Sequence, residues 1–319
     1  MSAAVERRAL PPDFDAGVAD AALSGLMASP KTLPPKLFYD ENGCRLFEAI
    51  TQAPEYYPTR TERALLGAVA AEAVADVAPG SALVEYGASD EGKAMFLLDA
   101  TDAFSAYVPI DIAAQGLASI VARLTRARPG LALHPVAADF LSPFTLPAAV
   151  AQAPRFGFFP GSTIGNLEPR RARSFLADAR RLLGADARFL VGVDLRKDPA
   201  ILVPAYDDAQ GVTAAFNLNL LHRLNREAQA DFDPDGFFHR ALWNAQQSRI
   251  EMHLVSKRAQ TVYVSGRRIV FAKGETIHSE NSYKYAPEDF LSLAESAGWR
   301  GCNLWTDSAR LFSLHLLRA

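Results

Sequence analysis

Short apolar runs alternate with amphipathic stretches through the middle of the chain, and most of these runs lead to a glycine or an acid. The first run contains Leu83 and Val84 and ends at Gly87, and a helical pattern begins at Lys93. Further apolar runs lie at 106–111, at 131–136, from 156 and at 188–194. Helical patterns lie between them at 114–126 and 168–183. Strands that alternate with helices predict a doubly wound α/β domain with a mostly parallel sheet.

The pattern changes after Asp194. Residues 205–221 form a helical segment that carries many polar groups, and apolar alternation over 250–273 predicts strands with a turn at 265–266. The remaining predicted elements are a helix and two antiparallel strands that return to the main sheet, at 287–297, 302–307 and 311–317.

The first sixty residues predict a more irregular region. We expect a mobile tip and then a helix within residues 1–30, and the prolines at 34–35 exclude a helix after it. The residues Asp-Glu-Asn-Gly at 40–43 predict a turn. A helix is predicted to start with Leu46 and to stop before Pro54, and Thr61-Glu62 predicts the next helix start.

These patterns predict two domains. The sheet domain comprises residues 61–195 and 287–319, and the second domain comprises 1–60 and 196–286.

Composition narrows the class of protein. The 319 residues are 49% apolar and 22% charged, with a net charge of −3, so nothing favours binding to nucleic acid or to an anionic membrane. Two distant thiols, Cys44 and Cys302, indicate a reducing compartment. No signal peptide or membrane span is visible. We expect a cytoplasmic protein, a monomer with a small-molecule substrate.

The turn after the first strand is a candidate ligand site. In a strand–turn–helix unit the ligand lies over the carboxyl end of the strand, and small residues such as Gly87 allow it to approach the backbone. Glu85 reaches a polar group from the strand end. The full dinucleotide motif is absent, because Ser89 stands in place of its second glycine.

The next two strands also end in acids. Asp111 is well placed to accept hydrogen bonds from the two ribose hydroxyls of an adenosine, or alternatively to cap the helix that starts near Ala113. Asp139 and Phe140 suit a purine, because a carboxylate accepts its exocyclic amine and an aromatic ring stacks on it. Three successive strands that end in Gly87, Asp111 and Asp139 predict a nucleotide-like cofactor more specifically than any one of them.

The fourth strand runs into the loop Pro160-Gly-Ser-Thr-Ile-Gly-Asn166, which is rich in residues that present backbone N–H groups. Asn166 is neutral and carries both donors and acceptors, which suits a small polar substrate. It is equally suited to capping the helix that Glu168 and Pro169 open.

Six segments of the chain are distinctive: Phe38-Tyr-Asp40, Pro54-Glu-Tyr-Tyr-Pro-Thr-Arg-Thr-Glu62, Gly161-Ser-Thr-Ile-Gly-Asn-Leu167, Tyr206-Asp-Asp208, Thr213-Ala-Ala-Phe-Asn-Leu-Asn-Leu220 and Glu280-Asn-Ser282. They resemble the L-histidine Nα-methyltransferases of ergothioneine biosynthesis, the EgtD family of class I S-adenosylmethionine-dependent methyltransferases. The resemblance extends in order from about residue 30 to the C-terminus. It implies an α/β fold with a Rossmann-like sheet, mostly parallel with an antiparallel C-terminal strand, and a second α+β lobe that binds the substrate.

The resemblance also implies roles for individual residues. Asn166 and Tyr206 match positions that hold the substrate carboxylate, while Glu280 and Ser282 match the pair that holds the imidazole. The positions implied for the cofactor are Tyr39, Gly87, Lys93, Asp111, Asp139 and Phe140. Those implied for the substrate are Tyr56, Gly161, Asn166, Tyr206, Thr213, Phe216, Met252, Glu280 and Ser282, with Thr163 as a further lining position. Tyr39 and Tyr56 are the catalytic candidates, because a tyrosine hydroxyl with a water could orient the amine and relay its proton.

The implied reaction is the transfer of three methyl groups from S-adenosylmethionine to the α-amine of L-histidine, which yields hercynine. One departure is visible, because the family usually has Gly-Ser-Gly where this chain has Gly87-Ala88-Ser89. No metal is proposed, since the six histidines and two cysteines show no metal-ligand spacing.

Three alternatives remain. The first is a methyltransferase for another amino acid or amine, such as one that bears an indole. The second is a regulatory protein that binds the cofactor without catalysis, and the third is a nicotinamide-dependent oxidoreductase. The substrate-side residues count against the second, and the weak glycine motif counts against the third.

Overall fold

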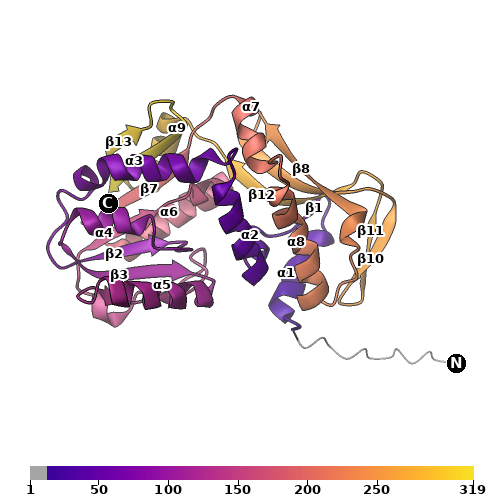
Figure 1. Cartoon of the computed structure of the whole chain (residues 1–319), viewed down its shortest axis with the longest axis horizontal. Coiled ribbons are helices and arrows are strands. Elements are labelled where there is room, and N and C mark those ends of the chain that lie inside the picture. The colour runs from indigo at the N-terminus through magenta and orange to yellow at the C-terminus, as the bar shows by residue number, and fades with distance from the viewer. Residues whose placement is uncertain (1–12) are drawn as a thin grey trace. The chain divides into compact units, whose positions relative to one another are not determined.

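The computed structural model describes residues 13–319, which fall into two units (Figure 1). Unit 1 comprises the described residues up to Tyr56, then Ala200–Trp243 and Ile250–Glu280. Unit 2 comprises Tyr57–Pro199, Asn244–Arg249 and Asn281–Ala319. The predicted tip at the N-terminus lies outside the described residues.

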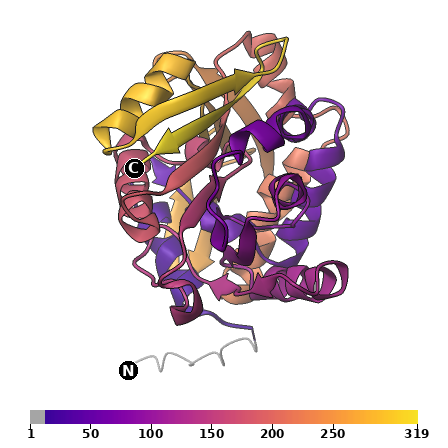
Figure 2. The ribbon, with the colours of Figure 1, turned by 90° about the vertical axis from the view of Figure 1, so that its left-hand side faces the viewer.

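Unit 2 is built on an eight-stranded sheet with the order β13-β14-β7-β6-β2-β3-β4, and β5 pairs with β3 beside β4. Its strands are β2 (Ser81–Tyr86), β3 (Phe104–Asp111), β4 (Ala132–Leu133), β5 (Val136–Ala137), β6 (Arg155–Phe159), β7 (Arg188–Asp194), β13 (Arg300–Thr306) and β14 (Phe312–Arg318). The pairs from β7 to β5 are parallel, whereas β14 pairs antiparallel with both β7 and β13. Figure 2 shows β13 and β14 as the pair of yellow strands.

Helices cover both faces of this sheet (Figure 1). One core packs α3 (Tyr57–Ala73), α4 (Ala94–Ala100) and α5 (Ala114–Ala127) against side chains such as Leu83 and Tyr107. The other packs α6 (Pro169–Leu183) and α9 (Pro287–Ser296) against the alternate side chains, such as Val84 and Val108. Successive strand residues point to opposite faces, so a sheet buried on both faces reads as the nearly continuous apolar runs of the sequence.

The predicted strands and helices of the sheet domain are confirmed, with one correction at residues 131–136. This segment is not one strand, because it pairs with β3 only through β4 and β5. Pro135, which has no N–H to donate, lies between the two short pieces.

Unit 1 contains a four-stranded sheet of order β1-β12-β9-β8 and a separate antiparallel hairpin of β10 and β11. Its strands are β1 (Lys31–Thr32), β8 (Phe237–Asn244), β9 (Arg249–Ser256), β10 (Gln260–Val264), β11 (Arg267–Phe271) and β12 (Thr276–Tyr283), of which β8, β9 and β12 continue into unit 2 by one to three residues. Its helices are α1 (Ala16–Leu26), α2 (Glu41–Gln52) and α8 (Val212–Glu227), and the short helix α7 (Pro199–Leu202) begins at the boundary. The 3-10 helices within residues 13–319 are η1 (Pro35–Phe38), η2 (Ala148–Val150), η3 (Thr163–Asn166), η4 (Pro204–Tyr206) and η5 (Pro234–Gly236). The predicted turn at 265–266 is confirmed as the hairpin turn.

Two predicted helix starts are wrong, those of α2 in unit 1 and of α3 in unit 2. The turn residues at 40–43 open α2 itself, because the Asp40 carboxylate caps it by accepting from the Gly43 amide at 2.7 Å. The helix expected from Thr61 begins four residues earlier as α3, which places Glu62 inside the helix.

The helical segment expected over 205–221 is also corrected. It is divided at Gly211, whose φ is +73°, into η4 and α8. The Asp208 carboxylate accepts from the Val212 and Thr213 amides at 3.0 and 2.7 Å and so fixes where α8 begins.

Within residues 13–319, no helix combines the length and the apolar character that a bilayer-spanning segment needs.

Candidate active site

The turn after β2 is open at Gly87. Its φ is +74°, a conformation that glycine adopts at little cost, and an added Cβ would meet only the Phe140 ring, at 3.7 Å. The amides of Gly87 and Ala88 both donate to the Ile110 carbonyl, at 2.8 and 3.0 Å, which ties this turn to the end of β3. The backbone is therefore held firmly while its outer side stays accessible to a ligand.

Glu85 lies just before this turn, buried within β2, and accepts a short hydrogen bond from the Tyr107 hydroxyl. Burial raises the pKa of Glu85 to about 8, although this bond opposes the shift. We expected Glu85 to contact a ligand, but its carboxylate instead bonds Tyr107 on the neighbouring strand β3.

Asp111 and Asp139 end neighbouring strand segments of unit 2. The Asp111 carboxylate accepts from the Ala113 amide at 2.7 Å, and burial raises its pKa. The capping interpretation is wrong, because the N-cap residue of α5 is Ala113 and no side chain caps this helix. Asp139 accepts from the Leu141 amide at 2.9 Å. The ribose and adenine roles of these acids remain predictions.

Phe140 belongs to an aromatic cluster of unit 2. Its ring lies 5.6 Å from those of Phe159 and Phe175, and it is only partly buried. A partly exposed ring next to the Gly87 turn suits a planar ligand group.

A buried carboxylate that the sequence analysis did not single out organises this part of unit 2. Glu62 is fully buried, pairs with the Lys93 ammonium at 2.6 Å and accepts from the Gly161 amide at 2.9 Å with both oxygens. It thereby joins α3 to Lys93 and Gly161, two residues that the resemblance assigned to the cofactor and the substrate. The detectable signal was a lone acid on the apolar face of a helix.

The loop after β6 carries Gly161 and Asn166. Asn166 ends η3 and is not the cap of α6, because that position is Glu168, whose side chain makes no capping bond. Ser162 adopts a left-handed conformation with φ +55°, and its hydroxyl accepts from the Asp194 amide at 2.9 Å. This bond ties the loop to the end of β7.

Unit 1 brings four of the substrate-side or catalytic candidates into one aromatic cluster. Tyr39 lies edge-on to Phe216 at 6.2 Å, and Tyr56 lies edge-on to Tyr206 at 6.1 Å. Phe47, which the sequence analysis did not single out, joins both pairs, because its ring lies 6.0–6.5 Å from those of Tyr39, Tyr56 and Phe216. We call these five residues (Tyr39, Phe47, Tyr56, Tyr206 and Phe216) the aromatic cage.

A buried hydrogen-bond chain holds Tyr206 in place. His239 bonds the Tyr206 carbonyl through Nε2 at 2.8 Å and accepts from Asn217 at Nδ1, also at 2.8 Å. Burial lowers the pKa of His239, which favours the neutral ring that this donor and acceptor pair requires. Thr213 is likewise buried, one turn before Asn217 on α8.

The other substrate candidates lie on neighbouring strands. Met252 is buried on β9, and its carbonyl accepts from the Ser279 hydroxyl at 3.0 Å. Glu280 and Ser282 are buried on β12. The Ser282 hydroxyl accepts from the Lys284 ammonium at 2.8 Å.

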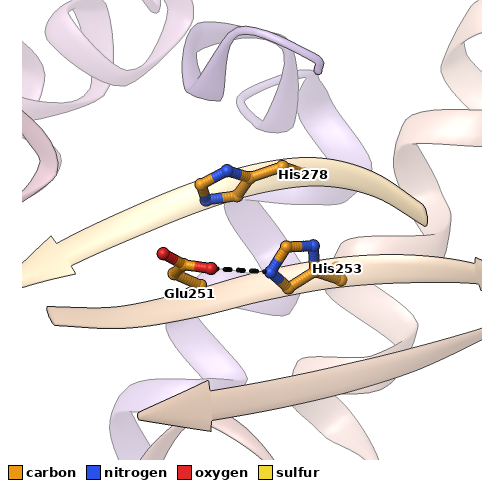
Figure 3. Close-up of side chains that lie close together, drawn as sticks. All are labelled: Glu251, His253 and His278. Atoms are coloured by element: carbon orange, nitrogen blue, oxygen red, sulfur yellow. Dashed lines mark hydrogen bonds and ion pairs between the residues drawn. The ribbon is translucent and has the colours of Figure 1, made fainter. Parts of the chain in front are cut away.

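Three further titratable side chains on β9 and β12 could hold a cation. Glu251, His253 and His278 offer ligand atoms within 4.8 Å of one another (Figure 3). The two imidazoles stack at 4.7 Å, and the His253 Nε2 lies 3.1 Å from Glu251. A metal-binding histidine usually has a hydrogen-bond partner for its second nitrogen. Nε2 of His278 has such a partner in the Glu280 carbonyl at 3.0 Å, whereas Nδ1 of His253 is buried without one.

The parallel sheet, the open turn after β2, the acids that follow it and the antiparallel β14 are the arrangement of class I S-adenosylmethionine-dependent methyltransferases. The model of the family described as histidine-specific, S-adenosylmethionine-dependent methyltransferases matches residues 18–319, and the chain belongs to this family. It is an N-methyltransferase of the Rossmann-like type.

Curated relatives are similar over most of the chain. A histidine N-alpha-methyltransferase of Mycolicibacterium smegmatis is 43% identical over 298 residues, which cover 92% of both chains. A 4-dimethylallyltryptophan N-methyltransferase of Trichophyton verrucosum is 29% identical and covers 92% of this chain and 91% of its own. The ergothioneine biosynthesis protein 1 of Neurospora crassa is 30% identical over 90% of this chain and 33% of its own length.

Proposed function

We propose that this enzyme trimethylates the α-amino group of L-histidine to hercynine, the first step of ergothioneine biosynthesis. The observation that carries the proposal is the match of residues 18–319 to the histidine-specific family. The aromatic cage supports it, because the product carries a quaternary ammonium group, and aromatic faces attract such cations.

The residues of unit 2 suit S-adenosylmethionine, which supplies the methyl group from a sulfonium. Gly87 leaves the turn open to the methionine part, Asp111 accepts from the ribose, and Asp139 with Phe140 receives the adenine. Lys93 lies 2.6 Å from Glu62 and is partly exposed. It neutralises the charge of the buried acid and does not alter the conformation of the turn after β2.

The protein's main contribution to a methyl transfer is alignment. An in-line displacement requires the amine lone pair to face the methyl carbon, and such positioning can contribute ~7–11 kcal/mol. In our proposal Asn166 and Tyr206 hold the carboxylate of the substrate, and the hydroxyls of Tyr39 and Tyr56 orient its amine. Each transfer releases one proton from the amine, which passes to water through a tyrosine hydroxyl.

The side chain of the substrate would be recognised by Glu280 and Ser282, with Met252 beside the ring. A buried polar pair rejects a substrate that lacks the matching groups, because its own hydrogen bonds would then be left unsatisfied. This feature favours histidine over an indole.

A substrate panel tests the assignment. Purified enzyme is incubated with S-adenosylmethionine and L-histidine, L-tryptophan or histamine, and the products are analysed by mass spectrometry. We expect one to three added methyl groups on histidine alone, since histamine lacks the carboxylate. Methylation of tryptophan instead would overturn the histidine assignment and support the alternative of an indole-bearing amine, which the fungal relative's substrate motivates.

The cage is tested by Phe47→Leu. This variant removes one aromatic face, worth about 0.5–2 kcal/mol toward a cation, so the third methylation is expected to slow about tenfold and dimethylhistidine to accumulate. Phe232→Leu is the matched control, because Phe232 belongs to the separate aromatic group of Phe237 and Phe271 in the same unit. Equal product distributions in the two variants would remove the cage from the proposal.

A further inference from the structure

We propose that Lys284 makes Ser282 a hydrogen-bond donor toward the substrate, so that the enzyme selects histidine with a neutral imidazole. Asp194 holds Lys284 for this role. The inference rests on the proposed function, since it concerns the ring that Ser282 would contact, and it names Lys284 as a positioning residue.

The bond between Lys284 and Ser282 sets the direction of the hydroxyl. The Lys284 Nζ lies 2.8 Å from the Ser282 oxygen and 2.6 Å from Asp194 Oδ2, and Lys284 is 1% exposed. An ammonium has three donors and no acceptor, so the Ser282 oxygen must accept in this bond. Accepting from a cation polarises the O–H of the serine, which strengthens it as a donor.

Two neighbouring side chains of β12 point away from this network. Asn281 and Tyr283 both donate to the Glu168 carboxylate, at 3.0 and 2.6 Å. Because alternate residues of a strand share a face, Ser282 and Lys284 lie together on the opposite face. Glu280 precedes Ser282 by two residues and has the same parity.

Asp194 is the centre of the support behind Lys284. Its carboxylate also accepts from the Tyr57 hydroxyl at 2.8 Å and from the Lys197 ammonium at 2.5 Å. Its amide donates to Ser162 in the substrate loop. One fully buried acid therefore positions both the loop that carries Asn166 and the lysine behind Ser282.

The charges of this network disfavour a second cation beside Ser282. Burial opposes the ionisation of Asp194, but the ammonium groups of Lys284 and Lys197 hold its pKa below the ordinary value. Burial lowers the pKa of Lys197 to about 8, against the attraction of Asp194 and of the more distant Asp307. One carboxylate thus faces two lysines, so the charge behind Ser282 opposes an imidazolium, whereas the Glu280 carboxylate at the other ring nitrogen would attract one.

The consequence for the ligand is a fixed tautomer. A neutral imidazole has one N–H and one lone pair, which would donate to Glu280 and accept from Ser282. An imidazolium has no lone pair to accept from Ser282, so it could bond the hydroxyl only through the second oxygen lone pair, beside the Lys284 ammonium that already uses the first. Affinity for histidine should therefore fall as the pH drops through the side-chain pKa of the ligand, which is about 6.5.

The test measures the dissociation constant of L-histidine by calorimetry at pH 7.5 and pH 5.5. S-adenosylhomocysteine replaces the methyl donor, so no turnover occurs. For the wild type we expect a dissociation constant about tenfold higher at pH 5.5, since the neutral fraction falls by about that factor. 3-(2-Thienyl)-L-alanine, whose ring does not titrate in this range, should show no such ratio.

Three variants and one control separate the hydrogen bond from the charge. Lys284→Met and Ser282→Ala should each reduce the tenfold ratio below about threefold, and the double variant should behave like either single one. Lys197→Met is the matched control, because Lys197 contacts the same Asp194 without a bond to Ser282, and it should keep the tenfold ratio. If Lys284→Met does not fold, Ser282→Ala provides the test, since it leaves the pair of Lys284 and Asp194 in place.

The inference is overturned if Ser282→Ala or a folded Lys284→Met keeps the tenfold ratio, or if Lys197→Met loses it equally. A wild type that methylates histidine but binds it independently of pH also overturns it while leaving the proposed function standing. A wild type that neither binds nor methylates histidine would instead contradict the proposed function itself.

Discussion

The substitution Glu62→Gln probes the buried pair that joins α3 to the candidate site. It keeps the shape of the side chain and one oxygen that can accept from the Gly161 amide, but it removes the charge that Lys93 meets at 2.6 Å. Loss of one partner of a buried pair typically costs 3–5 kcal/mol, because the other charge stays buried without compensation. The Lys93 side chain is 16% exposed and reaches water in part, so we expect about 3 kcal/mol.

The free energy of unfolding is measured by urea titration with tryptophan fluorescence. Two of the three tryptophans, Trp299 and Trp305, lie in unit 2 and report on the unit that contains Glu62. A lower midpoint with an unchanged slope would show a true loss of stability.

A double-mutant cycle with Lys93→Met isolates the pair. Lys93→Met strands the fully buried carboxylate, so it should cost at least as much as Glu62→Gln, while the double variant should cost clearly less than the sum of the two. A cost below about 1 kcal/mol for Glu62→Gln, or additive effects in the cycle, would refute the view that this pair holds unit 2 together.

Three further predictions concern other parts of the molecule. Burial lowers the pKa of His315 to about 4, so on acidification the unfolded chain binds a proton at this residue before the folded chain does. Wild-type stability should therefore fall by about 3 kcal/mol between pH 6.5 and 4. In urea titrations, His315→Gln should flatten this dependence on pH. Gly87→Ala should cost about 1 kcal/mol of stability through backbone strain and weaken S-adenosylmethionine binding several-fold. Gly80→Ala is the control, because Gly80 also has a positive φ but has open space around it. It should cost a similar amount of stability and leave binding unchanged. His239→Leu leaves the Tyr206 carbonyl without its donor and should raise the KM for histidine more than kcat falls; unchanged kinetics would contradict the positioning role.

Local patterns in the sequence determined much of unit 2. The boundaries of β7 and α6 follow from an apolar run and from a proline at the start of a helical pattern, and both depend on neighbouring residues alone. The hairpin turn at 265–266 is local in the same sense. The segments that resemble one family extended these predictions to the cofactor, the reaction and the candidate residues. The membership of the chain in this family is confirmed.

Only the tertiary structure decided which distant side chains meet. Nothing in the periodicity of α3 indicates that Glu62 bonds Gly161, 99 residues later, or that Lys284 and Lys197 share Asp194. The same holds for Phe47, which joins Tyr39 and Phe216 although it occupies an ordinary apolar position of α2. A helical or alternating pattern specifies which face of an element is buried but not what covers that face, because the partner comes from another part of the chain and is chosen by packing and by the need to pair every buried charge.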